Sequence, residues 1–447
     1  MHNAFIEKHL MDLYAGLELS PKERKFVESK NGRSDMRVAI SQELFRGDFE
    51  GRLDTSNLDI FPCNNGAFVT DAGGRPFFRQ IQASDYLTKT SGWAYDPEEA
   101  RAKRPEVDRF LEQVLPVPEE RAVFLAYAAS LLSGRRLAKR FLVFTDRRSG
   151  NNGKSMLAML VAKFFGRLAD SNGKKFVTRP AVERGGRNDH DAGTQGFTNV
   201  RVVIAEELKS NMLLDESMLK TLVSPMPMMK GRKFHVGGEF EYPWTAGFIL
   251  VFNEDNIPKV DAADAAFWAR VVVVPFRSKF VPADLVGDEP DTYPVDTHLV
   301  EKLNGWRSAF ADVMCDAYDS EGTVLDTIPQ SMREWKDDVK TTNNHVAEWM
   351  AQHIEFTQDH KDVAHRIVFD DGFVRVMMGR YREETEATLG HAEFAKLAKA
   401  YLKEGCCEWH VGSQKNVRIG TANGGTKTSK NVMVGIRLRQ VVVDDAV

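Results

Sequence analysis

One run of seven residues combines the types that bind phosphate: Ser149, Gly150, Asn151, Asn152, Gly153, Lys154 and Ser155. Glycines allow a tight loop whose backbone N–H groups point toward phosphate oxygens, and a helix that starts at the loop adds partial positive charge. In such a loop the Lys154 ammonium reaches the outer phosphates of a nucleotide, and the Ser155 hydroxyl binds Mg²⁺. The usual pattern is broken at one position, because Arg148 stands where the first glycine is expected.

The flanks of this loop support the same interpretation. An apolar run at 141–144 precedes it, and apolar residues at helical spacing follow it over 156–165. Strand, glycine-rich loop and helix in this order are the context that a phosphate-binding loop requires. We therefore expect the chain to bind a nucleotide, with ATP and Mg²⁺ as the cofactors, although the loop itself does not read the base.

Two acidic residues, Glu206 and Glu207, close the apolar run 202–204. ATP hydrolysis needs carboxylates at the end of a buried strand: one helps to hold Mg²⁺ and the other orients or polarises the attacking water. We expect Glu206 to be the acid at the metal. The alternative is a solvated strand end, where acid pairs are common.

Two further polar residues lie beside apolar strands. Asn253 ends the run 247–252, where an amide could position water or contact the outermost phosphate; the alternative is an asparagine that begins a turn. Arg270 precedes the run 271–274, where its planar, permanently charged group could reach a nucleotide on a neighbouring subunit. The alternative for Arg270 is a surface ion pair.

The segment 230–242 alternates around Gly237-Gly238 and predicts a hairpin with a two-residue turn. That turn would pair His235 with Phe240 and Lys233 with Tyr242 on one face, with Lys230 and Arg232 just before it. Cations interleaved with aromatic rings suit single-stranded nucleic acid, through phosphate pairing and base stacking. The alternative is that the aromatic rings pack a sheet face.

The elements that must position these residues alternate along the chain. Strands are predicted at 141–145, 200–205, 246–252 and 270–276, with helices between them, which indicates an α/β core. Two helices precede the core, with apolar stripes over 107–115 and 123–132. A hairpin is predicted within 58–70, a linker at 283–296 and helices over 298–318 and 330–356. The helix at 391–403 and the β-like run at 432–438 could form a small winged-helix module.

Composition excludes several classes of protein. The chain has 447 residues, a net charge of −4 and 43% hydrophobic residues, which is typical of a globular protein of two to four domains. No apolar run approaches the ~18–20 residues that cross a bilayer, so we expect no membrane segment, and the N-terminus lacks the pattern of a signal peptide. The cysteines form no C-x-x-C pair, which favours a reducing intracellular compartment without a zinc site.

Taken in order, these pieces resemble the superfamily 3 helicases, and most closely the ATPase half of viral primase-helicases of the poxvirus and giant-virus type, also found in some phages and plasmids. The likeness covers most of residues 55–350. The segments that carry it are 150–155, 201–207, 230–232 with its hairpin, 252–253 with Ile257-Pro258, and 268–270 with 274–276. Residues 85–97, the two helices before the loop and Ile328-Pro329 are similar to the family's flanking regions.

The resemblance implies an AAA+-like core, a homo-oligomer that is a hexameric ring, and ATP-driven translocation along single-stranded or forked DNA during replication. It implies that Asn253 senses the outermost phosphate, that Arg270 acts across the subunit boundary, and that Lys233 and His235 lie on a hairpin that grips DNA. A primase and other replication proteins are the implied partners. The implied location is the host cytoplasm or nucleus for a viral protein, and the cytoplasm for a phage or plasmid protein.

The expected organisation follows from both lines of reasoning: an α+β N-terminal region at 1–104, a helical lead-in at 105–138, the ATPase core at 139–282, and a mainly helical C-terminal region at 297–447 that could end in a winged helix. No primase domain is recognised, since the roughly 50 residues before the first hairpin are too few for one. Two other functions stay open. One is a double-strand DNA translocase or packaging motor, and the other is a DNA-bound replication scaffold with weak ATPase activity.

Overall fold

The computed structural model describes residues 20–29, 31–32, 34–35, 52–70, 74–135, 139–147, 150–171, 173–179, 199–210, 212–225, 227–232, 239–262, 264–342, 345–357, 366–385, 390–406, 408–410, 417–420, 426–429 and 432–439. The chain forms two compact units, Met1–Ser56 and Asn57–Val447, and each is described by itself. In the first unit, helix α2 (Pro21–Glu28) begins with a capping box. The Ser20 N–H donates to the Glu23 carboxylate at 2.8 Å, and the Glu23 N–H donates to the Ser20 hydroxyl at 3.4 Å.

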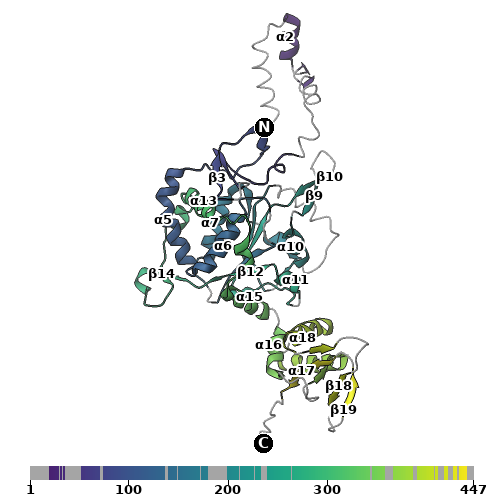
Figure 1. Cartoon of the computed structure of the whole chain (residues 1–447). Coiled ribbons are helices and arrows are strands. Elements are labelled where there is room, and N and C mark those ends of the chain that lie inside the picture. Colours follow the sequence, from purple (N-terminus) through teal and green to yellow (C-terminus); the bar gives the residue numbers. More distant parts are fainter. Residues whose placement is uncertain are drawn as a thin grey trace. The chain divides into compact units, whose positions relative to one another are not determined.

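A five-stranded parallel sheet is the centre of the second unit (Figure 1). Its order is β12 (Val271–Phe276), β4 (Phe141–Asp146), β11 (Gly247–Val251), β7 (Val202–Ala205) and β5 (Ala169–Asp170). The four strands predicted from the sequence are confirmed, and β5 is a short addition at one edge. All neighbours in this sheet pair in parallel. The core is therefore of the mixed α/β class.

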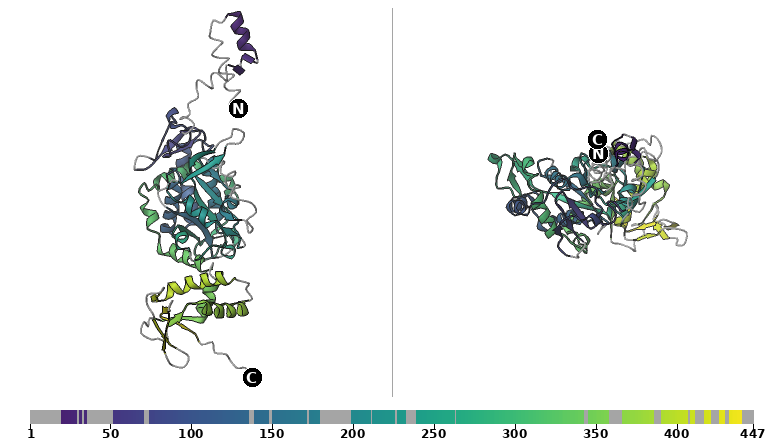
Figure 2. Two further views of the ribbon diagram at one scale, coloured as in Figure 1. Left: turned by 90° about the vertical axis from the view of Figure 1, so that its right-hand side faces the viewer. Right: turned by 90° about the horizontal axis from the view of Figure 1, so that it is seen from above.

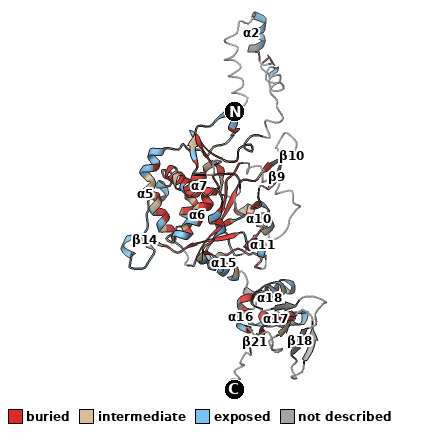
Figure 3. Ribbon diagram, viewed as in Figure 1, coloured by how far each residue is buried: buried red, intermediate tan, exposed pale blue. Residues whose placement is uncertain are grey.

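Alternate residues of each central strand enter two separate hydrophobic clusters, because successive side chains point to opposite faces of a sheet. Leu142 and Phe144 lie in one cluster, whereas Phe141 and Val143 lie in the other. Helices cover both faces, so the strands read as continuous apolar runs and are buried along their whole length (Figure 3). The first cluster includes residues of α5 (Pro97–Val114), α6 (Pro118–Ser130), α7 (Lys154–Phe165) and α13 (Arg307–Asp316). The second includes residues of α8 (Lys174–Val177), α10 (Glu216–Leu222), α11 (Ala265–Trp268) and α15 (Gln330–Thr342).

Helix α15 covers the outer edge of β12. Trp335 of this helix is buried in the second cluster, and the guanidinium groups of Arg147 and Arg277 lie 4.5 Å and 5.1 Å from its ring centroid. Arg277 also donates to the buried carboxylate of Glu120 at 2.5 Å, which links β12 to α6. Cation–π contacts thus hold α15 against the ends of β4 and β12, and the Arg277–Glu120 ion pair connects the same region to α6.

The remaining elements of this unit surround the sheet. Strands β1 (Ile60–Cys63), β2 (Gly66–Val69) and β3 (Phe77–Arg79) form an antiparallel sheet, which confirms the predicted hairpin at 58–70. The predicted linker contains β14 (Thr292–Pro294), which pairs in parallel with β13 (Lys279–Val281). Short elements are β6 (Thr178–Arg179), β8 (Leu213–Leu214), α12 (Leu299–Lys302) and α14 (Thr323–Asp326).

The predicted hairpin at 230–242 exists, but its predicted register is wrong. Strand β9 (Met228–Arg232) pairs antiparallel with β10 (Glu239–Pro243), so Phe240 lies opposite Gly231 and Tyr242 opposite Met229. A two-residue turn at Gly237-Gly238 is incompatible with this pairing. Tyr242 is buried and Met229 packs against the second cluster, so the hydrophobic core fixes this register.

The C-terminal part is more mixed than the mainly helical region that the sequence predicted. Helix α16 (His345–His353) ends before 356, and β15 (Ile354–Phe356) takes up residues expected to be helical. After it come β16 (Arg366–Val368), α17 (Asp371–Thr385), α18 (His391–Gly405), β17 (Glu408–His410), β18 (Val417–Gly420), β19 (Thr426–Ser429), β20 (Val432–Val434) and β21 (Ile436–Leu438).

The strands of this C-terminal part pair around β20. Strand β20 lies between β16 and β17, antiparallel to both, and α17 and α18 lie between β16 and β17 in sequence. The paired strands β18 and β19 fall between β17 and β20 in sequence. The winged-helix assignment stays a prediction. The helices pack on the small sheets around a core that includes Phe394, Leu402 and Met433 (Figure 2).

Arg201, at the start of β7, is a buried cation that ties the central sheet to β1. Its guanidinium donates to the carbonyl oxygens of Leu58 at 3.2 Å and Ile60 at 2.9 Å. We predict that Arg201→Ala lowers the free energy of unfolding by about 2–3 kcal/mol, because it removes the Arg201 donor from the Ile60 carbonyl oxygen and from the Leu58 carbonyl oxygen, which keeps the Gly134 N–H at 2.7 Å. Chemical denaturation measures this change.

The control for that variant is Arg135→Ala, which removes a more exposed ion pair with Asp59 from the same region. Its expected effect is below about 1 kcal/mol, as for other surface pairs. Equal effects of the two substitutions would show that the buried contacts of Arg201 do not carry the linkage.

Candidate nucleotide-binding site

The predicted loop connects β4 to α7, as the sequence indicated. Gly150 and Gly153 have φ values of +90° and +84°, and Asn151 also has positive φ, at 50°. Helix α7 begins at Lys154, whose N–H donates to the Asn152 amide oxygen at 3.4 Å. The N-cap residue is Gly153, which has no side chain to cap the other N–H groups of the first turn. Arg148 and Ser149 lie outside the described residues.

Gly153 is required at its position for two reasons. Its left-handed backbone suits glycine, and a Cβ there would lie 2.8 Å from Cγ2 of Val114 in α5. The loop therefore packs closely on the helix that precedes the core. Gly150 has a similar φ but open space around it, so only its conformation favours glycine.

Lys154 is buried and forms an ion pair with Asp146, the last residue of β4. The Asp146 carboxylate also accepts from the Asn152 amide, and from the Glu254 N–H at 3.3 Å. Burial lowers the pKa of the Lys154 ammonium, and the Asp146 carboxylate acts in the opposite direction. Lys154 is thus held by Asp146, the last residue of the strand that precedes the loop.

The candidate acids and Asn253 meet at the same edge of the sheet, because the carboxyl ends of parallel strands lie together. Strand β11 lies between β4 and β7, with Val251 opposite Phe144 and Leu250 opposite Ala205. Continuing the β11–β4 register places Asn253 beside Asp146. Glu206 lies one residue past the end of β7. The phosphate loop, Glu206 and Asn253 therefore occupy one edge.

Glu206 and Glu207 have different environments. Burial raises the pKa of Glu206, and the neighbouring Glu207 charge raises it further. Glu207 adopts a left-handed φ of 55°, and its carboxylate, which is 84% exposed, lies 4.0 Å from Lys174. A non-glycine residue in that region is strained by roughly 1–3 kcal/mol, and such strain often accompanies functional sites.

Arg270 lies at the opposite end of the strands, where their amino ends lie together. Its carbonyl oxygen accepts from the Phe141 N–H at 3.0 Å, at the start of β4, whereas the phosphate loop follows the end of β4. Six residues of β12, at about 3.3 Å each, separate the two edges by roughly 20 Å. Arg270 of one chain therefore does not meet the phosphate loop of the same chain.

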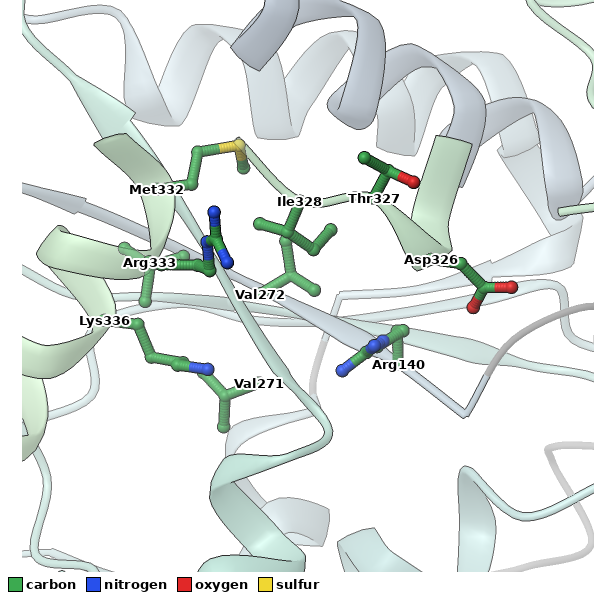
Figure 4. A pocket seen from close by; sticks show the side chains of 10 residues that line it. Arg140, Val271, Val272, Asp326, Thr327, Ile328, Met332, Arg333 and Lys336 are labelled. Atoms are coloured by element: carbon green, nitrogen blue, oxygen red, sulfur yellow. The ribbon is translucent and has the colours of Figure 1, made fainter. Parts of the chain in front are cut away.

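A cationic cavity of about 260 Å³ lies at this second edge, beside Arg140 and α15. Figure 4 shows Arg140, Arg333 and Lys336 around it, with Asp326 as the acid in its lining. Burial lowers the pKa of Lys336; Arg140 lowers it further, against the opposing effect of Asp337. Arg140 also donates to the Ala269 carbonyl oxygen, so this positive region adjoins Arg270.

The residues proposed to contact DNA are only partly placed. Lys230 and Arg232 belong to β9, in the hairpin described above, whereas Lys233 and His235 lie outside the described residues. Tyr242 is buried, which agrees with the alternative that this ring packs the sheet. Ser155, by contrast, is exposed at the first turn of α7.

Asp146 is the residue of this site that sequence reasoning missed. An acid at the last position of an apolar strand, directly before a phosphate loop, was the available signal. Among the described residues, no group of three or more His, Cys, Asp or Glu side chains could hold a metal ion. Magnesium binding by Ser155 and Glu206 therefore stays a prediction. Within the same ranges, no helix is long and apolar enough to cross a membrane.

The fold and the edge just described define an α/β core in which a glycine-rich loop, a candidate phosphate-binding loop, connects a central strand to a helix. Comparison with known proteins adds a resemblance to viral helicases. The chain is 29% identical over 197 residues to "Putative helicase 022R" of Frog virus 3 (isolate Goorha), covering 44% of this chain and 20% of that protein. It is 24% identical over 348 residues to "Putative helicase 121R" of Invertebrate iridescent virus 3, covering 74% and 36%.

A third relative, "Putative helicase L207/L206" of Acanthamoeba polyphaga mimivirus, is 24% identical over 272 residues, covering 59% of this chain and 27% of that protein. The chain thus spans between a fifth and about a third of the length of these relatives. No family model matches. Among solved structures, the A form of the apo NrS-1 C-terminal region aligns with 13% identity over 77% of each chain, at a TM-score of 0.40.

The raised pKa of Glu206 generates a prediction about stability. Above this pKa the Glu206 carboxylate is charged in both states, but water hydrates it better in the unfolded chain than the half-buried site does in the folded protein. This charge therefore destabilises the folded protein, and Glu206→Gln should raise the thermal midpoint at pH 7. The gain should shrink as the pH falls through the raised pKa of Glu206, and should vanish below its ordinary value of 4.5. Thermal unfolding across this pH range measures the effect, and Glu207→Gln is the control because that carboxylate is exposed. A gain of equal size at pH 4 and pH 7 contradicts the assignment.

Proposed function

We propose that this chain is an ATP-dependent, ring-forming DNA helicase that acts in replication and moves along single-stranded DNA, with hydrolysis at its subunit interfaces. The observation that carries the proposal is the division of the chemical groups between two edges of one sheet. The phosphate loop, Glu206 and Asn253 lie at the carboxyl edge, and Arg270 lies at the amino edge. A complete site then needs two copies of the chain, as in the AAA+-like ring that the motifs imply.

Within one subunit, the α7 N-terminus and the loop N–H groups would bind the phosphates of ATP. Lys154 would leave Asp146 for the outer phosphates, which offer it more negative charge. Of the two acids, Glu206 would stand at the metal, and Glu207, whose carboxylate is exposed, would orient or polarise the attacking water. Asn253 would contact the outermost phosphate or that water.

Magnesium fits the oxygen donors available at this edge. The Ser155 hydroxyl is exposed at the start of α7, and Glu206 supplies a carboxylate; both are hard ligands that suit Mg²⁺. When bound, the ion would neutralise phosphate charge. The residues themselves bind, orient and position the reactants.

Across the boundary, Arg270 of one subunit would contact the nucleotide held by the next and stabilise charge in the transition state. The cationic side chains of Arg140, Arg333 and Lys336 make this face of the subunit electropositive, which favours an anionic partner. Both features support contact with the carboxyl edge and the nucleotide of a second copy.

DNA binding would be local, since the whole chain carries a charge of −4. We place single-stranded DNA at the β9–β10 hairpin, whose connecting segment contains Lys233 and His235. Positive residues facing phosphates inside a ring would make the affinity fall steeply with salt. The names of the viral relatives support a helicase, and a primase or another replication protein is the proposed partner.

The C-terminal module gives a second contact with DNA in this proposal. We take it to be a winged helix, a fold that presents a helix to the major groove, and the pairing of β16 and β17 with β20 supports this. Residues 411–431, which include the β18–β19 pair, contain Lys415, Arg418, Lys427 and Lys430 and no acidic residue. We assign duplex DNA to this module.

Mixing two inactive variants tests whether the active site is shared. Lys154→Ala should abolish nucleotide binding, and Arg270→Ala should keep binding but lose about 10³-fold or more of the DNA-stimulated hydrolysis. A mixture of the two should regain activity, because some interfaces then join an intact loop to an intact Arg270. ATPase assays with and without single-stranded DNA measure this.

Three results would contradict the ring motor: no stimulation by single strands, an Arg270→Ala variant as active as the parent, or a mixture as inactive as its components. Stimulation by duplex alone favours the packaging motor instead. Retained replication function in Lys154→Ala favours the scaffold.

The duplex contact is tested by the double variant Arg418→Ala, Lys427→Ala. Removing two phosphate contacts should weaken duplex binding by about tenfold at moderate salt and reduce the slope of log affinity against log salt by about 2. ATP hydrolysis without DNA should not change. The matched control is Arg375→Ala, which removes an exposed cation of α17 that is paired with Asp371. Unchanged duplex affinity in the double variant contradicts this assignment.

A further inference from the structure

A second cavity, of about 610 Å³, opens directly beside the phosphate loop. Asn151, Gly153 and Met156 form its wall on the side of the loop, and α5, β13 and α12 enclose the rest. The Phe280 N–H donates to the Asn151 carbonyl oxygen at 2.7 Å, so β13 is bonded to the loop itself. The volume falls within the range of small-molecule sites in proteins.

Helix α5 presents one face to this cavity. Lys103, Glu106, Phe110, Gln113 and Val114 recur at intervals of three or four residues, which places them on one stripe of the helix. Phe110 packs against Trp306, with ring centroids 5.4 Å apart. The predicted apolar stripe of this helix therefore serves the cavity as well as the core.

The lining of this cavity is largely apolar, and few of its polar side chains lack a partner among the described residues. Phe280, Met156 and Trp306 supply ring and thioether surface, and Val295 and Val300 at the far wall are 49% and 48% exposed. Apolar side chains left open at a cavity wall are stabilised when a flat apolar ligand covers them. A purine base is such a ligand.

Most charges around the cavity neutralise each other. Lys103 pairs with Glu106 at 2.9 Å, and Lys302 pairs with Asp296 at 2.6 Å. Glu106 also accepts from the Trp306 indole at 3.1 Å. Three polar side chains of the lining, those of Arg109, Gln113 and Asn151, have no hydrogen-bond or ion-pair partner within the part of the chain that the structure describes.

We propose that this cavity binds the base and ribose of the nucleotide whose phosphates lie on the loop, that it prefers a purine, and that Gln113 reads the base. The Gln113 amide offers both a donor and an acceptor, which matches the polar edge of adenine. Arg109 lies one turn earlier on α5, near the cavity mouth, and contacts the ribose or the first phosphate. This inference rests on the proposed function, because it requires phosphates on the loop.

Calorimetry tests the inference. It measures, with Mg²⁺ present, how tightly the full chain binds ATP, GTP, CTP, UTP and inorganic tripolyphosphate. ATP and GTP should bind at least about tenfold more tightly than tripolyphosphate and the pyrimidine nucleotides. Gln113→Ala should weaken ATP binding by about fivefold and leave tripolyphosphate unchanged. Glu112→Ala, at the neighbouring exposed position of α5, is the matched control and should change neither ligand.

A second variant, Val300→Trp, blocks the cavity from an exposed position of α12, where the fold tolerates a larger side chain. It should weaken ATP binding but not tripolyphosphate binding. Equal affinities for ATP and tripolyphosphate, or equal losses of both in the two variants, overturn the base site while leaving the loop intact. Lys154→Ala separates the two proposals: if it leaves the binding of both ligands unchanged, the loop assignment fails and this inference fails with it.

Discussion

Parallel pairing of β4 with β11 on one side and β12 on the other is the constraint on which the site depends. The pairing fixes where β4 ends, and therefore where the phosphate loop begins. It also sets Asn253 next to Asp146, and through β7 it brings Glu206 to the same edge. The strands are buried on both faces by helices, so the sheet has little freedom to shift its register.

The same sheet explains why the site divides into two halves. A strand of six residues separates the loop at one end of β4 from Arg270 at the other. In the structure Lys154 pairs with Asp146, the anion that a buried ammonium needs. In the proposed function, nucleotide binding would exchange this partner of Lys154 for phosphate, so part of the favourable phosphate contact would offset the loss of the internal pair. The affinity for nucleotide would then reflect this difference and not the full strength of the new contact.

Much of the core followed from the sequence, because long apolar runs and the strand–loop–helix order are local signals. The central strands and the presence of helices α5 and α6 were predicted correctly, but α5 begins at Pro97, capped by Asp96, and not near residue 105. The hairpin at 228–243 was placed correctly but in the wrong register, because the burial of Tyr242 outweighed the glycine pair that suggested a tight turn. Asp146 was missed although an acid at the end of an apolar strand was a local signal, and its main partners, Asn152 and Lys154, are close in sequence. Gln113 could not be recognised, since its proposed role depends on a cavity formed by residues distant in the chain. The strand β15 was missed because its partner, β21, lies more than 70 residues later.

The two outermost strands of the central sheet, β12 and β5, offer little room for a further strand to pair. Helix α15 covers β12 at one edge, and β5 at the other has only two residues. A long, open edge would invite another chain to extend the sheet through backbone hydrogen bonds. In the proposed ring, copies of this chain would instead meet through side chains on helices and loops. Such contacts can slide and re-form one at a time, without the loss of a whole ladder of backbone bonds. An assembly joined in this way would change shape in small steps, as the proposed movement along DNA requires.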